Sequence, residues 1–84
     1  MGNSAIKLKL TQEQQEQIIA TAKAEAEPYI RVMNEIANLS IPTAIFKPDG
    51  TFTISHGYEE NETYIIAKGM VETIFERAQR KLNN

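Results

Sequence analysis

The chain has 84 residues, no cysteine and one histidine, and its 9 basic and 11 acidic residues leave a formal net charge of −2. This composition excludes a disulfide framework and a zinc site built from histidine and cysteine, and it lacks the basic stripe that nucleic-acid binding requires. A single domain of this size buries only roughly 60–65% of its unfolded surface. Since disulfides and zinc cannot supplement so small a core, association with another chain is the remaining means of stabilising it.

No apolar run in the sequence is long enough to cross a membrane. The first residues do not combine a basic region with a following apolar stretch, so no secretory signal is predicted. We therefore expect a cytoplasmic protein that has neither a membrane nor a nucleic acid as its partner.

Residues 1–84 are expected to form one domain, with residues 1–5 as a flexible tail because nothing in them would order the backbone. Residues 6–10 alternate apolar and cationic side chains with a period of two, which is typical of a half-buried strand. Lysines on the outer face suit the edge of a sheet. A disordered segment is the alternative to this N-terminal edge strand.

The first helix is predicted to begin after Thr11, which forms a capping-box pattern with Gln14. From Ile18 to Ile36, apolar residues recur every three or four positions, as on one face of an amphipathic helix. Pro28 interrupts this run, but the apolar stripe keeps its phase on both sides of it. The pattern favours one helix kinked at Pro28, and a second helix that begins near Pro28 is the alternative.

Two short strands, residues 43–47 and 51–55, are predicted on either side of the turn Pro48-Asp49-Gly50. Proline presets the first turn position, and glycine adopts the left-handed conformation that the turn requires. One register leaves one face of this hairpin apolar and the other mostly polar, as a hairpin packed on helices should be. It pairs Lys47 with Thr51, Phe46 with Phe52, and Ala44 with Ile54.

The last helix is predicted from about Tyr58 to about Leu82, with a broad apolar face, acids in its first turns and bases in its last. Gly69 interrupts its polar face, where alanine would be about 1 kcal/mol better. Either a neighbour packs closely against Gly69 or the position is exposed. The predicted fold class is α+β, a small antiparallel sheet covered by two amphipathic helices in the order β-α-β-β-α.

The stretch His56-Gly57-Tyr58 is the one candidate ligand site. Ser55 and His56 are adjacent on a strand and point to opposite faces, so they cannot form a nucleophile–base pair. The simpler interpretation is a strand exit, with Gly57 supplying unusual backbone angles. The alternative is a binding role, in which backbone donors at a helix start hold an anion with the help of His56 and Tyr58.

These patterns predict a protein that is not an enzyme and needs no cofactor or metal. The leading hypothesis is a non-catalytic interaction module that works as a homo-oligomer, most simply a dimer, with a further protein partner also compatible. Its expected interface lies on the last helix and includes Ile74, Phe75 and Leu82. The alternative is a binder of an anionic metabolite or nucleotide at residues 56–58. An accessory protein of a phage or mobile element fits both hypotheses.

Overall fold

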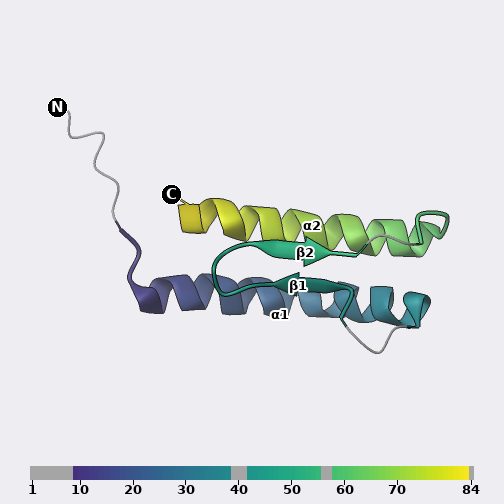
Figure 1. Ribbon diagram of the computed structural model, residues 1–84, viewed down its shortest axis with the longest axis horizontal. Coiled ribbons are helices and arrows are strands. Elements are labelled where there is room, and N and C mark those ends of the chain that lie inside the picture. Colours follow the sequence, from purple (N-terminus) through teal and green to yellow (C-terminus); the bar gives the residue numbers. More distant parts are fainter. Residues whose placement is uncertain (1–8, 39–41, 56–57, 84) are drawn as a thin grey trace.

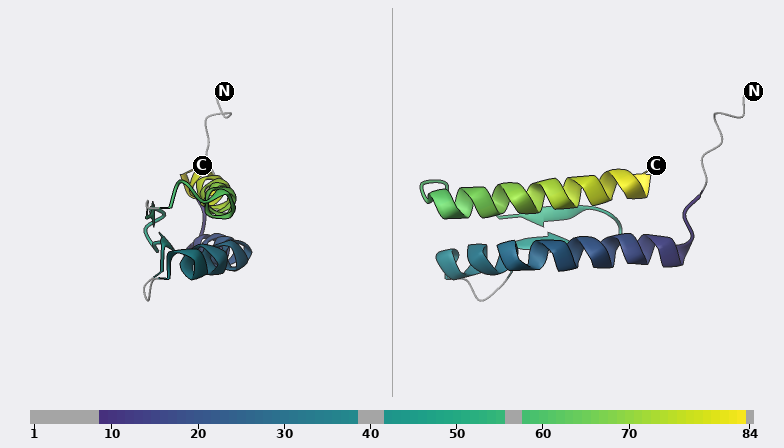
Figure 2. Two further views of the ribbon diagram at one scale, coloured as in Figure 1. Left: turned by 90° about the vertical axis from the view of Figure 1, so that its right-hand side faces the viewer. Right: turned by 180° about the vertical axis from the view of Figure 1, so that it is seen from behind.

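The computed structural model describes residues 9–38, 42–55 and 58–83. Their elements are α1 (Gln12–Ala37), β1 (Ala44–Phe46), β2 (Phe52–Ile54) and α2 (Glu62–Asn83). The two helices lie side by side and antiparallel, and the hairpin covers one face of the pair (Figure 1). An end-on view shows two layers, one of helices and one of strands (Figure 2). The α+β class is therefore confirmed, with the order α-β-β-α over the described residues.

The sheet has two strands within the described ranges, and the predicted N-terminal strand is not confirmed. Residues 6–8 of that strand, and the tail of residues 1–5, lie outside those ranges. Lys9 and Leu10 are described, and they precede α1 without strand structure. The Leu10 carbonyl accepts a hydrogen bond of 3.3 Å from the Gln15 side chain, so it is used by the start of α1 instead.

The first helix begins as predicted, at a complete capping box. The Thr11 hydroxyl accepts a bond of 3.1 Å from the Gln14 backbone, and the Gln14 side chain accepts one of 2.9 Å from the Thr11 backbone. Pro28 lies inside one unbroken helix, so the prediction of a single helix is confirmed. The helix ends at Asn38, whose left-handed conformation lets its backbone N–H donate to the Asn34 carbonyl.

The hairpin has the predicted register. Phe46 lies opposite Phe52 and Ala44 opposite Ile54, while the Lys47 N–H donates to the Thr51 carbonyl at 2.7 Å. Alternation along β1 buries Ala44 and Phe46 and leaves Ile45 exposed. The hairpin therefore packs its apolar face on the helices.

Replacing Gly50 with alanine is expected to lower the free energy of unfolding by about 1–2 kcal/mol. Gly50 has a φ of 89°, and a Cβ there would lie 3.2 Å from the Leu82 side chain.

Asp49→Ala is the control. It removes hydrogen bonds that the Asp49 carboxylate accepts from the hydroxyl and backbone of Thr51, and these bonds, the hydroxyl's first, lower the pKa of Asp49. Because Asp49 is exposed, its loss should cost less. Urea melts in which Gly50→Ala matches the wild type would contradict this account of the turn.

The last helix begins later than predicted, at Glu62 rather than near Tyr58. The physical reason is a cap at Asn61, whose side-chain oxygen accepts a bond of 2.9 Å from the Tyr64 N–H. The Tyr58 carbonyl accepts a bond from the Asn61 N–H and closes a separate turn that contains Glu59. Of the acids that the sequence predicts for the first turns of this helix, only Glu62 therefore lies in the first turn.

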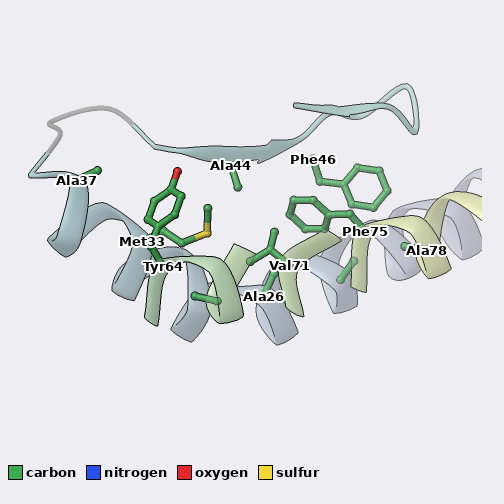
Figure 3. Close-up of a cluster of buried hydrophobic side chains, with 11 residues drawn as sticks. Ala26, Met33, Ala37, Ala44, Phe46, Tyr64, Val71, Phe75 and Ala78 are labelled. Atoms are coloured by element: carbon green, nitrogen blue, oxygen red, sulfur yellow. The ribbon is translucent and has the colours of Figure 1, made fainter. Parts of the chain in front are cut away.

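The core lies between the helix pair and the hairpin (Figure 3). Six of its eleven buried apolar residues are alanines. Its largest contacts are aromatic: the Phe75 ring lies 5.0 Å from that of Phe46 and 5.6 Å from that of Phe52, centroid to centroid. The Asn34 side-chain oxygen accepts bonds of 2.9 and 2.8 Å from the backbone and hydroxyl of buried Thr43, which attaches the hairpin to α1.

Candidate interaction surface

Of the predicted ligand site, His56 and Gly57 lie outside the described residues, and Tyr58 lies inside them. The Tyr58 hydroxyl donates a hydrogen bond of 3.2 Å to the Ala37 carbonyl at the end of α1. Its ring packs against Tyr64 with a centroid distance of 5.6 Å. These two contacts give Tyr58 a structural role, because they join the end of one helix to the start of the other.

Tyr64 is the better buried of these two tyrosines, and its hydroxyl donates a bond of 3.0 Å to the Ser55 carbonyl at the end of β2. Burial raises the pKa of Tyr64, and the negative charge of Glu59 adds to that effect. The hydroxyl therefore keeps its proton at neutral pH, and the bond to Ser55 persists.

An open hollow of about 460 Å³ lies beside Tyr58, and among the described residues Glu59, Glu60 and Asn61 also line it. Two carboxylates at its rim oppose the binding of an anion. They are also the residues that precede the first turn of α2, where an anion would otherwise be favoured. Within the described ranges, no three histidine, cysteine, aspartate or glutamate residues are grouped as metal ligands.

The predicted interface residues have three different environments. Phe75 has no exposed surface in the single chain, because the hairpin covers it through Phe46 and Phe52. Its place at an interface stays a prediction. Leu82 is half-buried against the core and lies next to Gly50. Ile74 is also half-buried, and it lines a groove between the helices.

The large apolar residues that remain exposed on α2 are Ile65, Ile66 and Met70. Ile66 exposes 67% of its surface and Met70 exposes 42%. Both belong to the broad apolar face that the sequence predicts, but they lie in a different part of it from Phe75. The breadth of that face indicates exposed apolar residues from sequence alone, since a helix that is covered on one side needs only a narrower apolar stripe.

Ile66, Met70 and Ile74 recur every four residues and therefore follow one stripe along α2. Ile74 continues this stripe into the groove of about 120 Å³ between the helices, which has a mixed apolar and charged lining. On α1, residues from Ile18 to Ile36 spaced by three or four follow the other side of the groove. We call this surface the open face. Its residues are Ile18, Thr21, Glu25, Tyr29, Val32 and Ile36 on α1 and Ile66, Met70, Ile74, Arg77 and Lys81 on α2.

The open face is turned away from the hairpin. The contacts of α2 with the hairpin run through Tyr64, Phe75 and Leu82, which form a separate stripe. On α1, Asn34 contacts the hairpin, whereas Val32 lies two residues away, about 200° around the helix. Seen from behind, no strand covers the two helices (Figure 2, right).

No family model matches this chain, and no curated protein or solved structure matches it either.

Gly69, the other unusual position of α2, has nothing within 4 Å of where a Cβ would lie. Of the two interpretations, a closely packed neighbour or an exposed position, the single chain therefore supports the second. A side chain at position 69 would point into open space. Neither of the two described helices has the length and apolar character of a membrane span.

Proposed function

We propose that this chain is a non-catalytic interaction module that works as a homodimer through the open face. The observation that carries the proposal is the 67% exposure of Ile66 beside the exposed Met70 and the half-buried Ile74. Fully burying a side chain such as isoleucine or methionine is worth about 1.5–3 kcal/mol. A second chain on this surface would recover that free energy twice, once for each copy.

The composition of the core supports the same proposal. Alanines make up six of its eleven apolar residues, so each buried position contributes little area. A small domain with such a core is marginal by itself. Apolar surface buried between two copies would supply the additional stability that small domains otherwise gain from disulfides or metals.

The open face is also large enough for a stable interface. A helix of 22 residues is about 33 Å long, and two helices side by side are roughly 20 Å across. Such a face offers on the order of 700 Å² before its ridges are counted, and a standard interface buries about 800 Å² per partner. The groove between the helices would receive side chains from the second copy.

The alternative hypothesis, an anionic ligand at residues 56–58, has less support. The hollow beside Tyr58 is rimmed by Glu59 and Glu60, and the Tyr58 hydroxyl is engaged by Ala37. A cytoplasmic location, a further protein partner and a mobile-element origin remain predictions from the sequence alone.

Replacing both Ile66 and Met70 with glutamate is expected to convert a dimer into a monomer at micromolar concentration. Two carboxylates on each copy would have to be desolvated and placed together, which opposes association strongly. Both positions are exposed in the single chain, so the helix content measured by circular dichroism should be retained. Multi-angle light scattering measures the mass.

Ile45→Glu is the matched control, because Ile45 is 46% exposed but lies on the outer face of the hairpin. This variant should keep the mass of the wild type. A monomeric wild type at micromolar concentration would end the proposal, as would a double variant that stays dimeric.

A further inference from the structure

The open face is divided along its length into an apolar end and a charged end. Glu25 on α1 lines the groove together with Ile74, Arg77 and Lys81 on α2. Because the helices run antiparallel, Glu25, the last groove residue of α1, lies level with Ile74, the first groove residue of α2, and Arg77 follows within about one helical turn. The helices are antiparallel, so seven residues forward on α1 correspond to about seven residues back on α2. Val32 therefore lies at the level between Ile66 and Met70. The apolar end consists of Tyr29, Val32, Ile36, Ile66 and Met70.

The charged end has both signs of charge and pairs neither of them internally. Glu25, Arg77 and Lys81 are exposed. Within the described residues, Arg31 and Glu27 form an ion pair on the outside of α1, whereas Glu25, Arg77 and Lys81 form none. A face with a free carboxylate on one helix and free cations on the other can be complementary to itself.

The spacing on α1 is that of a helix that packs in a bundle. Ile18, Glu25 and Val32 are seven residues apart, and so are Ala22, Tyr29 and Ile36. Together they give the alternating steps of three and four residues that place side chains along one seam. Half of this seam already faces α2 within the chain, and the other half is open to a further helix.

We propose that a second copy docks on the open face about a two-fold axis parallel to the helices, so that α1 of each copy packs against α2 of the other. This inference rests on the proposed homodimer and specifies its arrangement. The product is an antiparallel four-helix bundle with a hairpin on each outer side. An axis in this direction keeps every residue at its own level, because it exchanges the two helices without reversing the long direction of the face.

The two ends of the open face select this axis. With it, Val32 meets the partner's Ile66, and Glu25 comes within about one helical turn of the partner's Arg77. A two-fold axis running across the helices would reverse the levels. It would then bring the apolar end against the charged end, or it would overlap only the apolar ends and leave half of each face uncovered.

The test is to mix two charge-reversed variants, Glu25→Lys and Arg77→Glu, each of which is changed at an exposed position. In the proposed arrangement, either homodimer places like charges together twice, whereas the mixed dimer places opposite charges together twice. Native mass spectrometry, with a mass label on one variant, counts the three species. We expect the mixed dimer to exceed each homodimer by about ten-fold or more at low salt, against two-fold for random pairing.

Each substitution also creates repulsion between positions 25 and 77 within its own chain. That repulsion is the same for a given chain in both kinds of dimer, so the preference isolates the contact between chains. Random pairing would overturn this arrangement and leave the homodimer proposal intact. A monomeric wild type would overturn both.

Disulfide trapping gives an independent measurement, because the chain has no cysteine of its own. A mixture of Val32→Cys and Ile66→Cys is expected to form a mixed disulfide dimer upon oxidation. Met70→Cys alone should form little symmetric dimer, since the two copies of Met70 lie on opposite sides of the axis. Efficient symmetric cross-linking of Met70→Cys without the mixed product would favour an axis across the helices and overturn the proposal.

Discussion

Replacing Phe75 with alanine is expected to cost about 3–5 kcal/mol of the free energy of unfolding. Phe75 is fully buried, and its ring packs against both Phe46 and Phe52. Truncation leaves a cavity where the hairpin meets α2, and the short strands offer few other contacts that could close it. Proteins have about 0.05–0.15 kcal/mol of stability per residue, so this loss is a large fraction of the total stability of the domain.

Thermal and urea unfolding followed by circular dichroism measure this loss. Ile65→Ala is the control, because Ile65 is on the same helix but 46% exposed, and its loss should change the stability by about 0.5 kcal/mol or less. If Phe75→Ala kept the wild-type stability and lost only dimerisation, Phe75 would be an interface residue after all.

Replacing Pro28 with alanine is expected to raise the free energy of unfolding by about 1–3 kcal/mol. Proline inside a helix removes the hydrogen bond to the carbonyl four residues earlier, here that of Ala24, and its ring crowds that carbonyl, at a cost of about 3 kcal/mol. Pro28 is exposed, so its ring contributes little to the core. Alanine restores the backbone donor and has the best helix propensity.

The gain should appear as a higher urea midpoint with an unchanged slope. Lys23→Ala, at another exposed position of α1, is the control and should alter the midpoint only slightly. A less stable Pro28→Ala would contradict this expectation, and it would mean that α1 needs the local geometry imposed by proline to pack against α2.

The proposed dimer explains why the open face has an apolar end, whereas the anion hypothesis leaves Ile66 and Met70 without a role. The two layers of the molecule should therefore respond differently. Substitutions on the open face should alter the mass of the assembly in solution, and substitutions on the outer side of the hairpin should not. Phe75 lies between these layers, so Phe75→Ala should mainly lower the stability of the fold.

The sequence by itself determined the features that depend on residues a few positions apart. The capping box of Thr11 and Gln14 needs only two side chains and the adjoining backbone. The hairpin register follows from a turn with one left-handed glycine and from the alternation of apolar residues, which leaves one pairing with a single apolar face. These interactions are local, so the sequence patterns that encode them are local too.

The tertiary structure decided which part of an apolar face is covered. Periodicity places Phe75 and Ile66 on the same broad side of the last helix, but it does not indicate where the neighbours lie. The hairpin covers Phe75 and leaves Ile66 exposed, because Tyr64 and Leu82 hold its two ends on one stripe of α2. The burial of a side chain depends on packing between elements far apart in the sequence, so only the assembled helices and hairpin separate core from surface.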